Sequence, residues 1–224
     1  MKDENMKMKR IKLLVIALAI LMALTACSTK QPDNSNSKSE TKEAQQESKI
    51  SDTNKKLAKL YNQVLDNVDS YTFFECDYDI KFSYRYALVK LNHLDFPLLL
   101  VSADSDSDGM SYIKAFYPKD DTIKEILSSD LENVGVASAG GFRGSISQNA
   151  NHDNLIFSTL MSGTGDSSTE EIKPIIKNNE LVIEKNVVWE GRLDQKPDLN
   201  ITVSDIIYSD ISDRKMIEDL ASKK

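Results

Sequence analysis

The chain has 224 residues, enough for one domain with its own core, and a formal net charge of −7, with 35 acidic against 28 basic residues. A phosphate backbone is repelled by such a balance, so the composition argues against a nucleic-acid partner. Polar and apolar stretches alternate along the chain.

The first 26 residues have the three parts of a secretory signal peptide. A basic start precedes an unbroken apolar run of 12 residues from Leu13 to Leu24, and small residues follow it. The run falls short of the ~20 residues that a membrane-spanning helix needs. The basic start consists of Lys2, Lys7, Lys9, Arg10 and Lys12.

The four residues Leu24-Thr25-Ala26-Cys27 resemble the lipobox of bacterial lipoproteins. The resemblance implies that residues 1–26 are cleaved and that Cys27 carries a diacylglyceryl thioether. Two acyl chains, such as palmitate, anchor a protein stably, whereas one chain binds a membrane only marginally. The expected location is the extracytoplasmic face of a Gram-positive cell membrane. The alternative is an uncleaved N-terminal helix with an incidental cysteine.

A chain that starts at Cys27 keeps 23 basic and 33 acidic residues and a net charge near −10. With Cys27 acylated, Cys76 is the only other cysteine, so the monomer has no internal disulfide and depends on its hydrophobic core. Cys76 follows an aromatic run that begins at Tyr71, and we expect it to be a buried, small hydrophobic residue.

Residues 27–50 are polar and predict a disordered tether, because they cannot bury enough surface to offset the entropy of ordering. One globular domain is expected over residues 51–224. It begins with an α-helix whose apolar residues recur at helical spacing, and the helix should pack this stripe on a sheet. The stripe is Leu57, Leu60, Tyr61, Val64, Leu65 and Val68.

From Ser70 onward the pattern changes to a period of two, which predicts many short strands. The expected strands are residues 78–86, 96–101, 112–117, 121–127, 142–146, 155–161, 171–177, 181–189 and 200–207. Asn178-Asn179 predicts a tight hairpin turn, because Asn tolerates a positive φ. On the strand after the turn, regular alternation puts Leu181, Ile183, Val187 and Trp189 on one face.

Ser212 is the expected N-cap of a short final helix that turns Met216, Ile217 and Leu220 inward. The predicted fold is therefore α+β and mainly antiparallel β, with an N-terminal amphipathic helix and a short C-terminal helix. The sheet is expected to be a meander, a sandwich, a barrel or propeller-like, and the pattern leaves these closures open.

Residues 86–101, Tyr-Ala-Leu-Val-Lys-Leu-Asn-His-Leu-Asp-Phe-Pro-Leu-Leu-Leu-Val, resemble a segment of uncharacterised secreted Gram-positive proteins. Their pattern, Y-A-L-x-D-[IL]-[DN]-x-D-G-x-P-E-L-L-V, implies a strand, an acidic calcium-type loop and a second strand. Lys90 and Leu94 stand here in place of acidic ligands, Asp95 replaces the glycine and Leu98 the glutamate. Only Asn92 keeps ligand chemistry, so we expect apolar packing to hold this loop.

The string Asp104-Ser105-Asp106-Ser107-Asp108-Gly109 is the sharpest metal-like motif. Carboxylates at alternate positions followed by Gly suit Ca²⁺, which takes oxygen ligands in a tight turn. An EF-hand would need Glu eleven residues after Asp104, where Ala115 stands. The alternative, which we favour, is a solvated hairpin loop rich in turn-forming residues. No other cofactor is predicted.

The chain has only two histidines, His93 and His152, each close to an aspartate in the sequence. Such a pair can hold a metal or orient a base, but no third imidazole or cysteine completes a zinc set. Four aromatic residues offer a different chemistry, because they stack on sugars if exposed and pack in the core if buried. They are Tyr112, Phe116, Tyr117 and Trp189.

These patterns predict a surface lipoprotein that acts as a binding or interaction module, with an envelope or host ligand, and without a catalytic group of residues. The first alternative is an envelope hydrolase or metal-dependent enzyme that uses His93, His152 or residues 104–108. The second is a barrel that binds a small ligand in an apolar cavity.

Overall fold

The computed structural model describes residues 37–74, 80–107, 109–126, 134–136 and 141–223. The chain divides into a unit up to Gln45 and a compact unit from Gln46 to Lys224. Of the first unit, the structure describes the beginning of one helix. All packing described below lies within the second unit. The predicted signal peptide, the lipobox with Cys27 and the thiol of Cys76 lie outside the described residues.

Helix α2, Ser37–Asp66, begins well before the expected start near Ser51. Residues 37–50 were expected to be part of a disordered tether, and the structure corrects this. Glu, Lys and Gln, which lose little entropy in a helix, are frequent there and explain the extension. The predicted apolar stripe is confirmed, since Tyr61, Val64 and Leu65 are at most 2% exposed.

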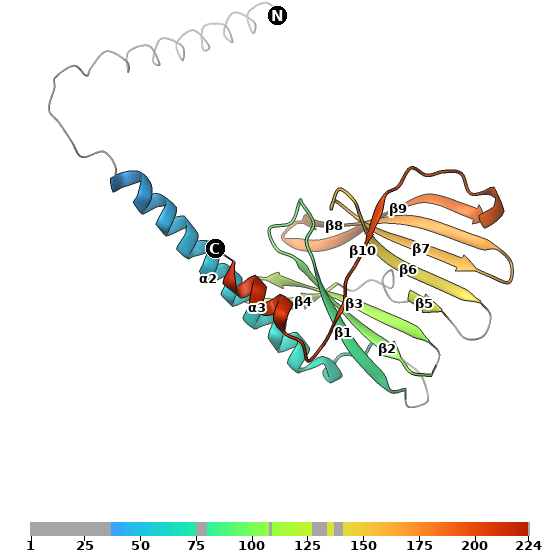
Figure 1. Ribbon diagram of the computed structural model, residues 1–224, viewed down its shortest axis with the longest axis horizontal. Helices are drawn as coiled ribbons and strands as arrows, with labels where there is room; N and C mark the ends of the chain where they lie inside the picture. The colour runs from blue at the N-terminus through green and yellow to red at the C-terminus, as the bar shows by residue number, and fades with distance from the viewer. Residues whose placement is uncertain (1–36, 75–79, 108, 127–133, 137–140, 224) are drawn as a thin grey trace, which may run out of the picture. The chain divides into compact units, whose positions relative to one another are not determined.

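The strands form one antiparallel sheet in the order β11-β1-β2-β3-β5-β6-β7-β8-β9, with β4 on β3 and β10 on β6 (Figure 1). The first half comprises β1 Phe82–Val89, β2 Leu98–Ser105, β3 Met110–Lys119, β4 Thr122–Glu125 and β11 Ser209–Asp210. The second half comprises β6 Phe142–Asn149, β7 Leu155–Met161, β8 Asp166–Lys177, β9 Glu180–Arg192 and β10 Val203–Asp205. The short β5, Val134–Val136, pairs with β3 and β6 and so joins the halves.

Two buried clusters lie on the two faces of β1–β3. One face packs on α2 and on α3, Lys215–Ser222, around residues such as Tyr86, Val101 and Phe116. The other face contacts the second half through Leu98, Leu100 and Ile113, which cluster with Leu155 and Ile172. The two halves therefore share a core. Successive residues of a strand point to opposite faces. Because both faces of β2 are buried, its residues are apolar on both.

The predicted fold class, α+β with mainly antiparallel strands and a short C-terminal helix, is confirmed. Along β1 to β3 and β5 to β9 the sheet order follows the chain, as in a meander. The predicted hairpin turn is also confirmed, because Asn178 and Asn179 join β8 to β9 with φ of 51° and 62°. The short strands β5 and β11 were not predicted, since two or three residues carry no periodic signal.

A β-bulge in the β8–β9 pair corrects the predicted faces of β9. Val187 lies opposite Glu170, but Trp189 lies opposite Thr169, so one extra residue separates the two. Paired residues share a face and neighbouring ones do not, so the bulge moves Trp189 to the face opposite to Leu181, Ile183 and Val187. Regular alternation cannot reveal an inserted residue, and the prediction for Trp189 was therefore wrong.

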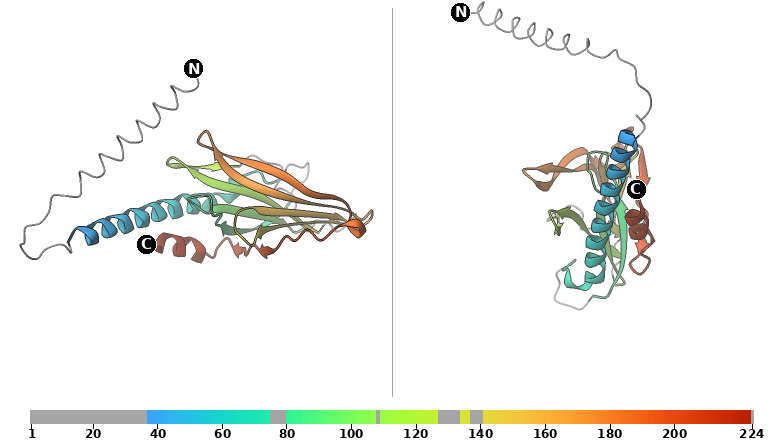
Figure 2. Two further views of the ribbon diagram at one scale, coloured as in Figure 1. Left: turned by 90° about the horizontal axis from the view of Figure 1, so that it is seen from above. Right: turned by 90° about the vertical axis from the view of Figure 1, so that its left-hand side faces the viewer.

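After β9 the chain passes through the 3₁₀ turn η3, Leu193–Gln195, and returns to β10 in an extended path coloured orange to red in Figure 1. We call residues 193–203 the strap. Beyond β10, the chain pairs as β11 with β1 and ends in α3. Helix α3 runs antiparallel to α2, because Arg214 pairs with Asp66 at 2.9 Å and Asn54 donates to the carbonyl of Lys223 at 3.1 Å (Figure 2).

The predicted inward residues of α3 are confirmed, because Ile217 and Leu220 are buried and Met216 packs against their cluster. Ser212 is not the N-cap of α3. Its hydroxyl and its N–H donate to Asp210, while the Asp213 carboxylate accepts from the N–H of Lys215 at 2.9 Å. The N-cap residue is Arg214, whose side chain makes no capping hydrogen bond. None of the helices in the described part of the chain combines the length and apolarity that a membrane crossing requires.

Candidate functional site

The strongest candidate site lies on the outer face of the second half of the sheet. Leu155 and Ile172 point into the shared core. The residues next to such inward positions therefore point outward. The register sets Ile156 opposite Glu171 and Ser158 opposite Thr169, so these four side chains form one patch across β7 and β8. The bulge adds Trp189 beside Thr169.

The strap crosses this patch and leaves two adjoining hollows. One, of about 320 Å³, is lined by Ile156, Ser158 and Thr169 from the sheet and by the strap from Lys196 to Val203. The other, of about 340 Å³, is lined by Glu171, by residues 149–151 of the β6–β7 loop and by the strap residues 200–202. Both hollows share Asn200 and Ile201. We call the two together the strap groove.

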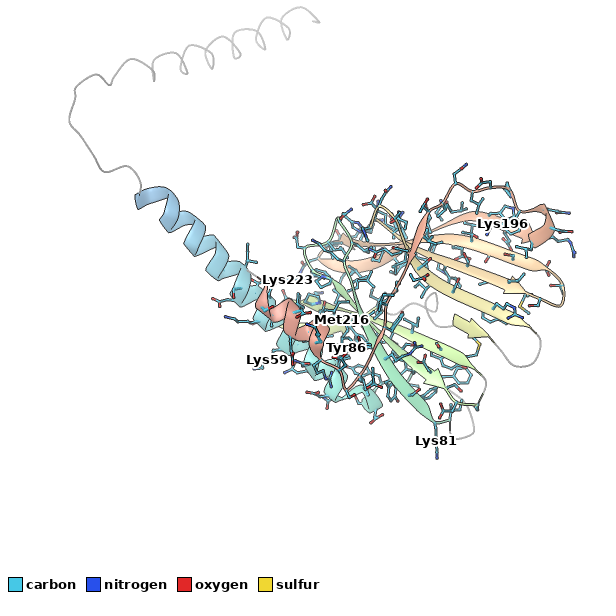
Figure 3. All side chains as sticks on the ribbon, viewed as in Figure 1. Lys59, Lys81, Tyr86, Lys196, Met216 and Lys223 are labelled. Carbon is cyan, nitrogen blue, oxygen red and sulfur yellow. The ribbon has the colours of Figure 1, made fainter. Side chains whose placement is uncertain are left out.

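Lys196 is held in a fixed position at one end of the strap groove (Figure 3). Its Nζ donates to Thr169 Oγ1 at 2.8 Å and lies 5.6 Å from the centre of the Trp189 ring. The contact with the indole face is a cation–π interaction, which stabilises the charged ammonium. Gly191 leaves room for the ring, because a Cβ there would lie 3.3 Å from Trp189 Cζ2.

The other end of the groove is rich in amide and hydroxyl groups. Asn149 uses its Oδ1 to accept from the N–H groups of Asp153 and Asn154, at 2.8 and 3.1 Å, so its amide NH₂ points elsewhere. Asn151 and Asn200 line the same hollow together with Thr202 and the Glu171 carboxylate. Amides that donate and accept, beside a carboxylate, suit a ligand with many hydroxyl groups.

The four aromatic residues proposed for sugar stacking are not equivalent. Tyr112, Phe116 and Tyr117 are at most 4% exposed, so they are core residues. Trp189 is half-buried beside the strap groove, with Lys196 over its ring. It is the only tryptophan of the chain. Its fluorescence therefore reports on this groove alone.

The predicted calcium-type string forms part of the β2–β3 hairpin. Asp104 lies in β2, Asp106 is in the turn that follows, and Asp108 lies outside the described residues. The Asp104 carboxylate accepts hydrogen bonds from Arg85 Nε, from Ser102 Oγ at 2.7 Å and from Ser111 Oγ at 2.6 Å. Burial alone would raise the pKa of Asp104, but these bonds outweigh it and hold the pKa below its ordinary value. This carboxylate is thus already engaged.

Arg85 also lies 5.6 Å from the centre of the Tyr208 ring. Burial raises the pKa of the Tyr208 hydroxyl, and this oxygen has no hydrogen-bond partner within the described part of the chain. We call Arg85, Ser102, Asp104, Ser111 and Tyr208 the Arg85 cluster. It is a network with the carboxylate at its centre.

The two histidines lie on neighbouring loops, because the N–H of Asn92 donates to the carbonyl of His152 at 2.8 Å. His93 Nε2 bonds to the carbonyl of Pro174 at 2.5 Å, and His152 adopts a positive φ of 56° in a turn. Among the residues that the structure describes, no group of three or more His, Cys, Asp and Glu side chains is placed to hold a metal.

Residues 86–101 form the end of β1, a loop and the beginning of β2. Leu91 and Leu94, which are at most 6% exposed, hold the loop by apolar packing, as predicted. This loop also lines a third hollow, of about 300 Å³, against Met216 and Leu220 of α3. Figure 3 labels Met216 and Lys223 there, away from Lys196.

Sequence reasoning missed Lys196, Thr169, Glu171 and Asn200 as site residues. Lys196 and Thr169 are 27 positions apart, and only the strap and the sheet register bring them together. The Asn-rich loop at 149–154 and the turn formers at 197–200 were the available signals, and both read as ordinary loops.

Comparison of the chain with family models, with curated proteins and with solved structures found no match.

Proposed function

We propose that this protein is a lipid-anchored, extracytoplasmic binding module that takes a hydroxyl-rich ligand of the saccharide class in its strap groove. The observation that carries the binding role is the groove itself: two adjoining hollows of about 340 and 320 Å³ with a fixed ammonium at one end and amides at the other. Small-ligand sites typically have a hollow of this size on which a small number of polar groups converge.

The location rests on the sequence. The basic start, the apolar run and Leu24-Thr25-Ala26-Cys27 together support lipidation at Cys27. An anchored module outside the membrane meets the glycans of the cell envelope, and this favours a saccharide over other polyols. The ligand sits on an outer sheet face, so no barrel cavity is needed.

Several features make the groove suitable for sugars. Asn and Glu side chains make paired hydrogen bonds with neighbouring hydroxyl groups, and the groove supplies both at Asn151, Asn200 and Glu171. Ile156 and Ile201 line the adjoining hollow, and their apolar atoms suit the C–H face of a sugar ring. The strap and the sheet are both held by backbone pairing, since β10 continues the strap onto β6, so the groove is preformed.

Labelling with radioactive palmitate tests the anchor. The protein should incorporate the label and stay with membranes, and Cys27→Ala should abolish both. Cys76→Ala is the matched control, because it removes the other cysteine of the chain. Membrane retention of the Cys27→Ala protein would contradict the proposed anchor.

Titration with disaccharides tests the groove. N,N′-diacetylchitobiose and the disaccharide of N-acetylglucosamine and N-acetylmuramic acid are the two probes, and Trp189 emission is the readout. At least one should bind, and Asn200→Ala should weaken it several-fold, whereas Asn62→Ala on α2 should not. Absence of binding by both probes, or binding that Asn200→Ala leaves unchanged, would contradict the proposed function.

A further inference from the structure

We infer that Lys196 makes the strap groove selective for an acidic saccharide, because its ammonium is held by Thr169 in the groove and no carboxylate among the described residues pairs with it. This inference rests on the proposed function and names the chemistry of the ligand.

The two acidic residues nearest to Lys196 in the sequence are engaged elsewhere. Asp194 pairs with Arg192 at 3.3 Å, and Asp198 accepts a hydrogen bond from the N–H of Asn200 at 3.0 Å. No carboxylate forms an ion pair with Lys196 in the part of the chain that the structure describes. Several lysines of β3, β8 and β9, in contrast, each have a carboxylate partner. Lys114, Lys119, Lys177 and Lys185 each pair with a glutamate.

Lys196 is nevertheless half-buried, and a buried charge costs free energy unless it is paired. Thr169 Oγ1 accepts one of its three N–H groups, and the Trp189 ring faces the ammonium. Neither partner carries a negative charge. Lys196 lines the hollow of about 320 Å³, and its ammonium is bonded to Thr169, which lines the same hollow, so a ligand carboxylate that enters there completes the coordination of the ammonium.

The fixed position of the ammonium favours selectivity. A free lysine side chain loses up to ~2 kcal/mol of rotamer entropy when it becomes ordered on a ligand. Here Thr169, which is 3% exposed, and Trp189 hold the side chain before the ligand arrives. The side chain therefore loses this entropy on folding and not on binding, and a larger part of the free energy of the new ion pair contributes to affinity.

The charge of the whole protein sharpens this argument. The surface is acidic overall, with 35 acidic against 28 basic residues. Such a surface repels anions in general, so an anion is accepted only where a local cation compensates. Asn151 and Lys196 line different hollows of the groove, and Asn200 lines both. A sugar that carries one carboxylate fits both ends.

The experiment compares one disaccharide in two charge states. The probes are the disaccharide of N-acetylglucosamine and N-acetylmuramic acid, whose lactyl group carries a carboxylate, and its methyl ester, which keeps the shape without the charge. Calorimetric titration of the purified protein should give about tenfold tighter binding of the acid, which corresponds to ~1.4 kcal/mol. Lys196→Gln should remove this preference, and Lys196→Arg should retain most of it.

The control is Lys177→Gln, which removes an exposed lysine from the same half of the sheet and should keep the preference. Thermal melting of each variant shows that it is folded, and Thr169→Val provides a second change that frees the ammonium without removing it. Equal affinity for acid and ester in the unchanged protein, or a preference that survives Lys196→Gln, would overturn the inference. Binding of both probes with equal affinity would still support the proposed function, whereas binding of neither would contradict it.

Discussion

The molecule contains two similar clusters, each with a cationic side chain, an aromatic ring and one or more hydroxyl groups. They differ in whether a carboxylate is part of the cluster. In the Arg85 cluster, a guanidinium lies 5.6 Å from the centre of a tyrosine ring and donates to the Asp104 carboxylate, which also accepts from two serine hydroxyls. At Lys196, an ammonium lies 5.6 Å from the centre of a tryptophan ring beside a threonine hydroxyl. The first cluster contains its own carboxylate, Asp104, and the second contains none.

This difference separates a structural network from a receptive one. The Asp104 carboxylate accepts three donors, so a ligand would have to displace bonds that are already made. The Lys196 ammonium has an aromatic ring and a hydroxyl, and its remaining donor capacity faces a hollow. The motif that looked most like a site in the sequence is thus the closed one. The counterpart at Lys196, which lacks a carboxylate, is the open one.

The largest expected effect is on stability at the closed cluster. Asp104→Asn should lower the free energy of unfolding by about 2 kcal/mol, because bonds to a charged group are lost and Arg85 is left without its partner. Urea unfolding measures this. Asp106→Asn in the adjoining turn is the control and should change stability by less than ~0.5 kcal/mol. Equal effects of the two changes would remove the basis of the comparison.

The next effect concerns the hairpin that carries the groove. Asn179→Ala should cost about 1 kcal/mol, because alanine is disfavoured at the φ of 62° that this turn requires. Asn179→Gly should be nearly neutral, since glycine adopts positive φ without a steric cost. Urea unfolding separates the two variants. A turn that tolerated both equally would mean that the tip of β8–β9 contributes little to the fold.

A smaller effect is expected where Gly191 meets Trp189. Gly191→Ala places a Cβ 3.3 Å from Trp189 Cζ2, so the ring has to shift by a few tenths of an ångström. The emission of the sole tryptophan should change, and the preference for the acidic disaccharide should fall two- to threefold. Gly163→Ala is a control, because no atom lies within 4 Å of its added Cβ. An unchanged emission spectrum would show that the ring is not confined by Gly191.

The smallest effect is on pH dependence. The pKa of Asp104 lies below its ordinary value of 3.8 in the folded protein, so the unfolded chain binds the proton more readily. Its contribution to stability is complete above pH ~4 and is lost as the pH falls through the folded pKa. Asp104→Asn should therefore flatten the acid end of the stability curve. A curve with the same slope in both proteins would contradict the role given to this carboxylate.

The sequence predicted the regular parts of the fold well. The helical stripe around Tyr61 and the positive φ of Asn178 and Asn179 follow from local spacing and turn chemistry, and both are confirmed. The bulge was not predicted, because the amino-acid sequence of β9 does not reveal where one residue is inserted into the strand. That single residue decides on which face Trp189 lies. The site itself depends on it.

The strap groove was invisible in the sequence for a related reason. Its residues come from β7, β8, the β6–β7 loop and the strap, and no short motif unites them. Asp104 shows the opposite case, since a motif that reads as a ligand string has its carboxylate bound by Arg85. The local sequence tells which chemical groups are present, and tertiary contacts decide which of these groups remain accessible to a ligand.

A crystal structure of the protein with the acidic disaccharide bound tests the central claim most directly. We expect the disaccharide in the strap groove, with its carboxylate about 3 Å from Lys196 Nζ and its hydroxyl groups on Asn151 and Asn200. A disaccharide bound in the hollow beside Met216 and Leu220, or in the strap groove with its carboxylate turned away from Lys196, would contradict the claim.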